Sequence, residues 1–202
     1  MGYVKLDITS IRTKALRTEK ARNRALIKAE RITEREKDRL IEAFESHPVT
    51  KEIAAGPLAP NTSNTLGGYG NLFSFIGFDA GSDPITPVKN LLEKIEVKNL
   101  KYKVKNQQYI ATVRYPEKEE IRSVSPLPFE TGKSWVVGIE KGISGFTQYI
   151  YKKFLKGKSK EGLQSEKMDR SGNYQKTNYL FSMLSVFVKN IKGGKNDYSV
   201  WK

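Results

Sequence analysis

The 202-residue sequence contains no cysteine and a single histidine, His47. Without cysteine there are no disulfides, thiolate zinc sites or cysteine nucleophiles. One histidine is too few for the common zinc sites, and His47 precedes Pro48 at an expected helix end, where capping or exposure is the ordinary role of such a side chain. No serine lies in a nucleophile-elbow motif. The sequence therefore indicates no enzyme, no metal and no cofactor.

Long apolar runs are also missing. No stretch approaches the roughly 20 apolar residues that a membrane-spanning helix needs. The first residues lack the apolar segment of a secretory signal, and Leu6 stands where a myristoylation motif has Ser or Thr. We therefore expect a protein synthesised in a cytoplasm, with no membrane partner. Only 38% of the residues are hydrophobic, so part of the chain is expected to lie outside a conventional core.

Positive charge is abundant. There are 36 Lys and Arg residues against 22 Asp and Glu, a formal net charge of +14. This balance favours polyanionic partners, such as nucleic acid, an acidic protein surface or anionic lipid. The first part of the chain holds six candidates for contacts to a polyanion: Arg12, Lys14, Arg17, Arg22, Arg24 and Lys28.

A long helix is predicted from Thr9 or Ser10 to Ser46, because residues 9–46 contain neither Gly nor Pro and are mostly good helix formers. Its apolar seam is thin and is interrupted by Glu36; it consists of Ala25, Ala29, Ile32, Leu40 and Phe44. A seam this narrow favours a helix that lies on a neighbouring subunit or leaves the body. A solvated arm, a rod that contacts nucleic acid and a strut between subunits remain open.

Residues 61–78 form a connector of eighteen residues without a charged side chain. Its glycines invite comparison with a phosphate-binding loop, but no Lys follows them and no strand–loop–helix unit surrounds them. Glycine lets another backbone come close, so we interpret the connector as a contact segment that folds fully only against neighbouring subunits. The candidates for subunit contact here are Leu72, Phe73, Phe75, Ile76 and Phe78.

The next part of the chain predicts a small antiparallel sheet. Thr86 and Pro87 begin a short expected helix, and two alternating runs within residues 95–115 indicate a β-hairpin with a bulge near Lys98. A third strand is expected over residues 120–124. The predicted fold class is therefore α+β: a long N-terminal helix, a Gly/aromatic connector and a small antiparallel sheet packed by one or two C-terminal helices.

The C-terminal third predicts two helices around a basic loop. Residues 135–155 have helical periodicity with Gly138, Gly142 and Gly145 on one side, which indicates close approach of another backbone or a break at Gly142. Residues 156–176 are expected to be a flexible basic loop. Residues 179–191 suit a final helix, although a strand fits residues 186–188. The three glycines and Trp201, in the tail, are further candidates for subunit contact.

The predicted organisation has five parts. They are an extended helical arm (1–60), a contact segment (61–84), an α+β body (85–155), a flexible basic loop (156–176) and a C-terminal helix with a tail (177–202).

Residues 9–155, with the motifs in residues 61–78 and 135–145, resemble small virion proteins of tailed bacteriophages that form neck rings or complete the tail. The resemblance implies a homo-oligomeric ring that joins head to tail or finishes the tail, with arms inserted into neighbours. Its partners would be the portal or connector, or the tail tube or sheath, and its basic lumen would face packaged DNA. It would reside in the virion after synthesis in the host cytoplasm. The basic segment 156–176 has no counterpart in that pattern.

Two other functions compete with this one. A nucleic-acid-binding module would use the helix over residues 12–28 and the loop over residues 156–176, and its binding would depend steeply on salt. A ribosome-associated protein would use the same surfaces on rRNA.

Overall fold

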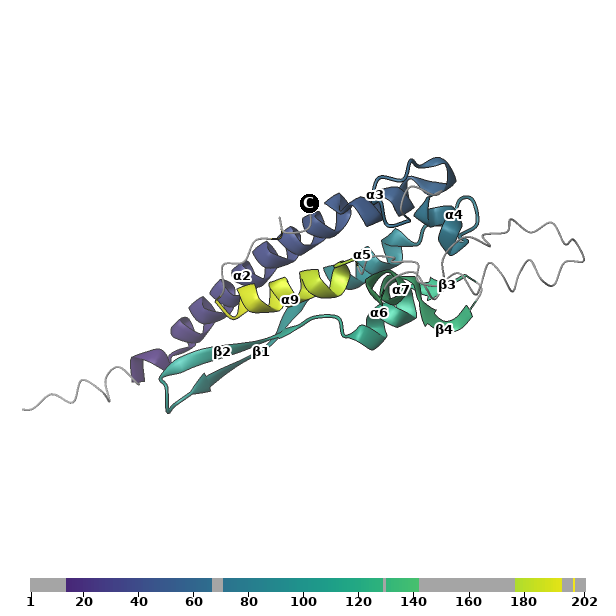
Figure 1. Ribbon diagram of the computed structural model, residues 1–202. Helices are drawn as coiled ribbons and strands as arrows, with labels where there is room; N and C mark the ends of the chain where they lie inside the picture. Colours follow the sequence, from purple (N-terminus) through teal and green to yellow (C-terminus); the bar gives the residue numbers. More distant parts are fainter. Residues whose placement is uncertain (1–13, 67–70, 129, 142–176, 194–197, 199–202) are drawn as a thin grey trace, which may run out of the picture.

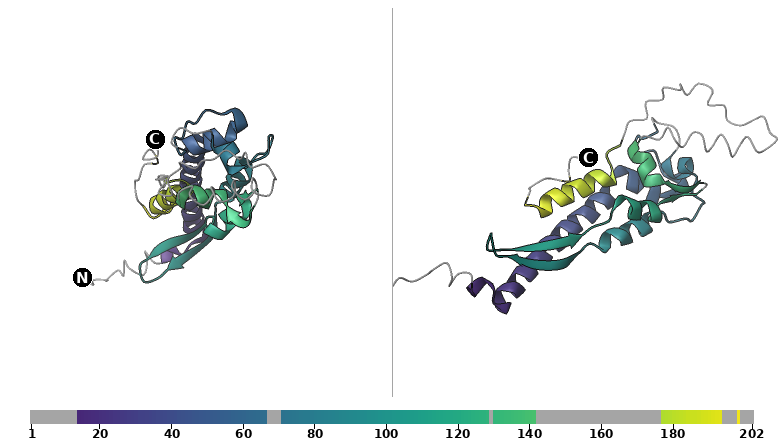
Figure 2. Two further views of the ribbon diagram at one scale, coloured as in Figure 1. Left: turned by 45° about the vertical axis from the view of Figure 1, so that its right-hand side comes forward. Right: turned by 90° about the horizontal axis from the view of Figure 1, so that it is seen from below.

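The computed structural model describes residues 14–66, 71–128, 130–141, 177–193 and 198 (Figures 1 and 2). Over these residues the fold is α+β, as predicted. The long helix α2 (Glu19–Ser46) and the final helix α9 (Leu180–Ile191) pack side by side, and two small antiparallel sheets accompany them. The other elements, in chain order, are α3 (Pro48–Ala54), the 3-10 helix η1 (Gly56–Leu58), α4 (Leu72–Ile76), α5 (Ile85–Glu93), β1 (Glu96–Lys103), β2 (Gln108–Arg114), α6 (Lys118–Val124), β3 (Pro126–Leu127), β4 (Glu130–Ser134) and α7 (Trp135–Lys141).

The start of α2 differs from the prediction. The predicted start at Thr9 or Ser10 lies outside the described residues, but the predicted helix is not continuous: residues 14–16 are helical and α2 begins only at Glu19, because the backbone of Thr18 is extended (φ −67°, ψ 149°). The Thr18 hydroxyl accepts a hydrogen bond from the N–H of Ala21 at 3.3 Å and donates one to the carbonyl of Ala15 at 2.8 Å. Thr18 is therefore the N-cap, and Glu19 follows it in the first turn, where a negative charge is favourable.

The predicted end of α2, at Ser46, is confirmed. His47 stops the helix and caps the next one, since its Nδ1 accepts a hydrogen bond from the N–H of Val49 at 3.2 Å. The side chain is buried, with 6% of its surface exposed, so of the two expected roles capping is confirmed and exposure is wrong.

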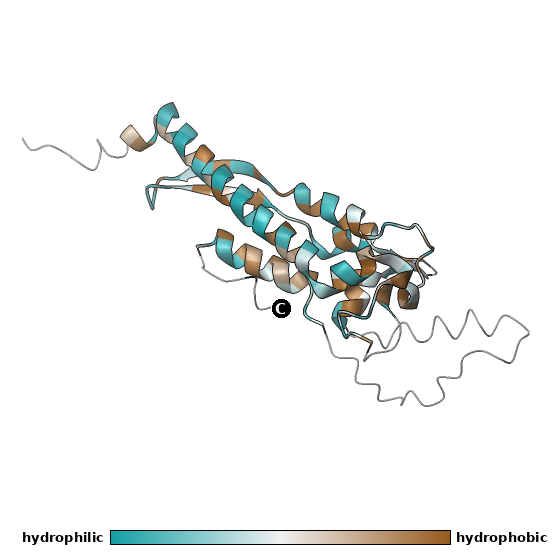
Figure 3. Ribbon diagram, turned by 90° about the horizontal axis from the view of Figure 1, so that it is seen from above, coloured by the Kyte–Doolittle hydropathy of each residue, from teal (hydrophilic) through white to brown (hydrophobic). Residues whose placement is uncertain are grey.

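One hydrophobic core holds the described elements together. Leu40 and Phe44 of α2, Trp135 of α7 and Phe187 of α9 are each at most 1% exposed. Tyr179, just before α9, is fully buried among the rings of Phe44, His47 and Trp135. In Figure 3, hydrophobic residues gather in α9 and the short helices, while the first half of α2 is largely hydrophilic. The second half of α2 is therefore part of the core, and the expectation that the helix leaves the body holds for its first half alone.

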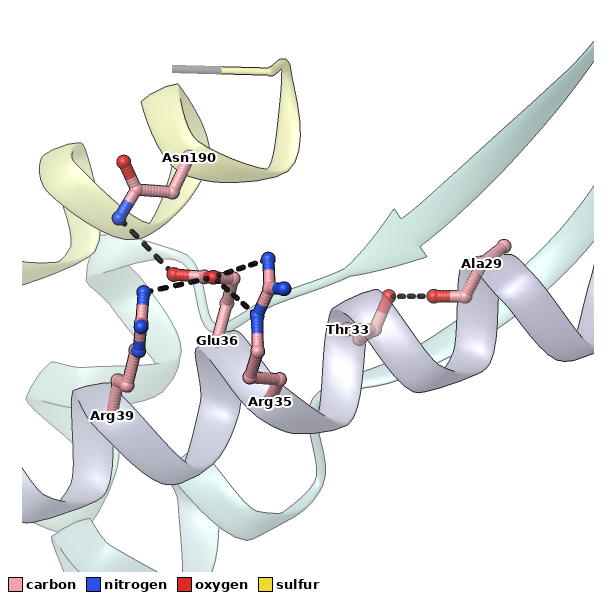
Figure 4. A network of polar contacts seen from close by, with 6 residues as sticks. All are labelled: Ala29, Thr33, Arg35, Glu36, Arg39 and Asn190. Atoms are coloured by element: carbon pink, nitrogen blue, oxygen red, sulfur yellow. Dashed lines mark hydrogen bonds and ion pairs between the residues drawn. The ribbon is translucent and has the colours of Figure 1, made fainter. Parts of the chain in front are cut away.

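Glu36, which interrupts the apolar seam of α2, is buried (Figure 4). It is 2% exposed and pairs with Arg35 at 3.0 Å and Arg39 at 3.4 Å, while the Asn190 amide of α9 donates to it at 3.1 Å. The seam therefore continues through a buried carboxylate with polar partners on both helices.

The connector folds onto its own chain. The Glu52 carboxylate accepts hydrogen bonds from the N–H of Ser63 at 2.9 Å and of Leu72 at 2.7 Å. The Asn71 amide donates to the carbonyls of Pro57 and Ala59, and its oxygen accepts from the N–H of Ser74 as the N-cap of α4. These two side chains fix the loop, and Gly77 ends α4 in the left-handed conformation (φ 86°) that glycine adopts without strain.

The predicted hairpin is confirmed as β1 and β2. The strands pair antiparallel, and the register shifts between Val97 and Asn99, where the bulge was expected. The pairs Val97–Val113, Leu100–Ala111 and Tyr102–Tyr109 share one face of the sheet. This face packs against α2.

The third expected strand is wrong, because residues 118–124 form α6. Glu117 and Glu120 make a capping box, in which each side chain accepts a hydrogen bond from the other residue's backbone N–H. Glu119 lies beside them in the first helical turn. The chain then forms a second hairpin, β3 with β4, that the sequence did not predict.

The remaining helix predictions have mixed outcomes. The short helix α5 is confirmed. Its capping side chain was expected to be Thr86, but it is Asp83, whose carboxylate accepts hydrogen bonds from the N–H groups of Ile85 and Thr86. The final helix α9 is confirmed over a strand. Helix α7 covers the first seven residues of the expected helix over 135–155, and the expected break at Gly142 and the basic loop lie outside the described residues.

Candidate interaction surface on the basic arm

A basic arm is formed by residues 14–31 and 97–114, that is, the helical turn before α2, the first part of α2 and the β1–β2 hairpin. The Tyr109 hydroxyl donates a hydrogen bond to the carbonyl of Leu16 at 2.5 Å. The guanidinium of Arg17 lies 6.0 Å from the ring centre of Tyr102, which itself packs on Tyr109. These contacts join the hairpin to the helical turn before α2, so that the two elements extend together from the body, by which we mean the other described residues (Figure 1).

The basic arm buries little surface. Leu100 is its one buried residue, at 9% exposed, and all of the arm's residues are described. Two of the four large exposed apolar side chains among the described residues, Ile27 (63% exposed) and Val104 (56%), belong to the arm. A two-stranded sheet is marginally stable by itself, and here the cover comes from α2 on one face. The outer face of the hairpin and both of its edges stay open within the described part of the chain.

The arm holds most of the chain's net charge. Residues 14–31 contain seven Lys or Arg and two Glu, and residues 97–114 contain five Lys or Arg and no acid, so the arm has a formal net charge of +10. The body, as defined by the described residues, contains twelve Lys or Arg and fifteen Asp or Glu, which gives it a formal net charge of −3. The described molecule is therefore electrostatically polar, with a positive arm and a slightly negative body.

Four cations form a stripe along the outer side of α2: Lys20, Arg24, Lys28 and Arg31. Their spacings of four, four and three residues put them on one helix face. All four are exposed, and none makes an ion pair within the described residues. Arg35 and Arg39 continue the row, but both form ion pairs with Glu36.

The predicted polyanion contacts map onto this arm, except Arg12, which lies outside the described residues. Lys14, Arg17, Arg22, Arg24 and Lys28 are all exposed. Arg22 is two positions from Arg24, so the two point to different sides of the helix, and Arg17 is directed at Tyr102. Lys20 and Arg31 complete the stripe and were not among the candidates; counting charges at a spacing of four residues would have found them.

The hairpin lysines were also missed: Lys98, Lys101, Lys103 and Lys105. Lys101 and Lys103 alternate with Leu100 and Tyr102, which face α2, and so lie on the outer face of the sheet. The signal was present, because a strand with apolar residues at every second position directs the residues between them to the other face.

The candidates for subunit contact in the connector are corrected. Leu72, Phe73 and Ile76 are at most 4% exposed because the chain's own helices cover them, so they have no surface to offer another subunit. Phe75 and Phe78 are half-buried against the same core. The expectation that the connector folds only against neighbours is therefore wrong for its described residues.

Of the other contact candidates, Gly138 lies half-buried in α7, while Gly142, Gly145 and Trp201 lie outside the described residues.

Two titratable side chains in the body have displaced pKa values. Burial lowers the pKa of His47 to about 4, against the opposing effect of the Asn178 carbonyl. Burial raises the pKa of Glu140 to about 7, although the backbone N–H groups of Phe181 and Tyr179 and the charge of Lys118 act in the other direction. Among the described residues, no group of three or more His, Asp or Glu could hold a metal ion, and no helix is long and apolar enough to cross a membrane.

Compared with protein-family models, with curated proteins and with solved structures, the chain gives no match.

Proposed function

We propose that the chain is a structural subunit of a homo-oligomeric ring in a tailed-phage virion, where it joins head to tail or completes the tail through protein–protein contacts. Its neighbours would be the portal or connector, or the tail tube or sheath, and it would enter the particle after synthesis in the host cytoplasm. The resemblance in element order supports the virion setting. The basic arm supports assembly into a ring.

The observation that carries the proposal is the arm's incomplete burial. Thirty-six residues extend from the body and bury one side chain, Leu100, while Val104 is exposed at the hairpin turn. Ordering a segment of this length costs conformational entropy, and against it the arm sets one buried leucine and side chains that are only half-buried. Contact with a second copy would add the missing burial, as obligate interfaces do.

The charge distribution favours a head-to-tail contact. Two arms of net charge +10 repel each other strongly. The repulsion between an arm and the rest of a second chain is much weaker, because that rest has a net charge of only +4, with −3 on the described body. A contact between different surfaces of identical subunits is heterologous, and such contacts close into rings when the rotation between subunits permits. The outer face of the hairpin, with Lys101 and Lys103, is the surface that we assign to the neighbouring copy.

The test combines a hairpin variant with a matched control. Lys101→Glu, Lys103→Glu and Val104→Gln alter exposed residues of the arm; Lys51→Glu, Lys141→Glu and Leu58→Gln make the same changes at exposed residues of the body. Negative-stain microscopy should show rings for the unmodified chain and for the control, and single subunits for the hairpin variant. Equal ring formation by both variants would exclude the hairpin as the assembly surface.

A nucleic-acid-binding module that acts as a monomer is the second candidate, because an arm of +10 also suits a polyanion. It predicts a monomer that binds free DNA or RNA at sub-micromolar concentration. A ribosome-associated protein would prefer rRNA over DNA in the same measurement.

A further inference from the structure

The stripe on α2 is a row of cations without partners. Lys20, Arg24, Lys28 and Arg31 are exposed and lie outside every ion pair of the described residues, whereas Arg35 and Arg39 on the following turns share the carboxylate of Glu36. At 1.5 Å per residue, the eleven steps from Lys20 to Arg31 span about 17 Å. The stripe therefore lies on one helix face and, among the described residues, is free of ion pairs along its whole length.

We infer that this stripe contacts the phosphate backbone of double-stranded DNA. Each strand carries one phosphate per roughly 3.4 Å of helix axis, so a row of this length has several phosphates within reach of its side chains. A regular line of like charges matches a linear polyanion better than the irregular charges of a protein surface. Two of the four side chains are arginines, whose planar fork binds phosphate oxygens through two hydrogen bonds.

The chemistry of the stripe makes the contact independent of base sequence. Its long cationic side chains reach phosphates, and phosphate contacts position a protein on a duplex without reading bases. The hairpin lies on the other side of α2, so DNA on the stripe leaves the outer hairpin face free for a neighbouring copy. The two faces of one arm thus take two different partners.

The inference rests on the proposed function for its setting, since packaged DNA would pass the stripes of a ring. The binding itself is measured on the chain in solution. If the chain is a monomer that binds DNA through the stripe, the proposed ring is refuted and the DNA contact is supported. If the chain forms a ring whose DNA binding does not depend on the stripe, the ring is supported and the DNA contact is refuted.

The experiment compares two variants that each remove four positive charges. The stripe variant is Lys20→Gln, Arg24→Gln, Lys28→Gln and Arg31→Gln; the control is Lys51→Gln, Lys141→Gln, Lys189→Gln and Lys192→Gln, all exposed residues of the body. Fluorescence anisotropy with a labelled duplex of mixed sequence gives the binding constant at several salt concentrations. Circular dichroism confirms that both variants keep the helical content of the unmodified chain.

The stripe variant is expected to bind at least tenfold more weakly at low salt. Its plot of log K against log salt should be shallower by about 3 to 4, because each lost phosphate contact removes about 0.9 from the slope. The control should change the slope by less than about 0.9, the value for one phosphate contact. Equal losses in both variants would overturn the inference, since net charge alone would explain the binding, and so would no binding of the unmodified chain to the duplex. Equal competition by polyglutamate would overturn it too, by assigning the stripe to an acidic protein.

Discussion

The Asn190 amide of α9 donates a hydrogen bond to the buried Glu36 carboxylate of α2, across 154 positions of sequence (Figure 4). This contact lies at the junction of the body and the basic arm. On one side of it α2 is buried under α9, and on the other side the helix continues into the arm. Glu36 therefore connects the helix that forms the arm to the final helix α9.

Replacing Glu36 with Ala should destabilise the fold by about 2–4 kcal/mol, because the buried Asn190 amide loses this acceptor and a cavity remains. The double change Glu36→Leu and Asn190→Leu should stay within about 1 kcal/mol of the unmodified chain or exceed its stability, since a buried polar pair contributes little net free energy. Urea denaturation measures both values. The control Glu42→Ala, on an exposed position of α2, should shift stability by less than about 0.5 kcal/mol; a similar shift for Glu36→Ala would contradict the assigned role.

The pKa of His47 makes the fold sensitive to acid. The pKa is about 4 in the folded chain and 6.5 in the unfolded chain, because burial disfavours the charged ring. Between these values the unfolded state binds more protons, so the stability from neutral His47 is complete above pH 6.5 and is lost as the pH falls to about 4. His47→Asn keeps a capping oxygen and should remove this slope from a series of denaturation curves. An unchanged slope would mean that His47 does not titrate as assigned.

The pKa of Glu140 makes the stability of the fold depend on pH in the opposite direction to that of His47. Its carboxylate accepts a hydrogen bond from the N–H of Phe181 at 2.6 Å, and burial raises its pKa from 4.5 to about 7. Here the folded state binds more protons, so its contribution to stability is complete below pH 4.5 and is lost as the pH rises through about 7. Glu140→Gln keeps an acceptor oxygen and should flatten this fall. Where the two pH ranges overlap, the slopes of His47 and Glu140 oppose each other, and each single variant should expose the slope of the other group.

The side chain of Asn71 has two roles, because its oxygen caps α4 and its amide N–H groups bind backbone carbonyls, and one substitution can distinguish them. Asn71→Asp keeps the oxygen that caps α4 but removes the N–H groups that bind the carbonyls of Pro57 and Ala59 at 2.6 and 3.1 Å. The variant should lose about 1–3 kcal/mol, because the carbonyls of this partly buried site would lose their donor and meet a carboxylate. Capping alone would predict no loss, since Asp and Asn are comparable N-caps. Thermal unfolding of the variant distinguishes the two outcomes.

The elements predicted correctly from the sequence are those with a local period. The alternation around Leu100 and Ala111 indicated the hairpin and its bulge, and the spacing of Leu180, Leu184 and Phe187 indicated α9. In α9 the periodic side chains are buried, and in the hairpin they form the face that packs against α2, so in both cases the pattern reports directly on packing.

The misses involve partners that are distant in sequence or unusual caps. Residues 120–124 were predicted as a strand because the cap of α6 is Glu117 and not the usual Ser, Thr, Asp or Asn. The connector was predicted to need another subunit because nothing local indicates that Glu52 binds the backbone of Ser63 and Leu72. The charge of the arm could be counted from the sequence, but its gathering at one end depends on the contact between Tyr109 and Leu16.

The central claim is that the chain assembles with itself through the arm, and its native mass tests this most directly. Native mass spectrometry and mass photometry of the purified chain should give a single multiple of 22.9 kDa, of ring size, that the hairpin variant reduces to 22.9 kDa. A stable 22.9 kDa monomer at the highest soluble concentration, together with tight binding to free nucleic acid, would contradict the claim.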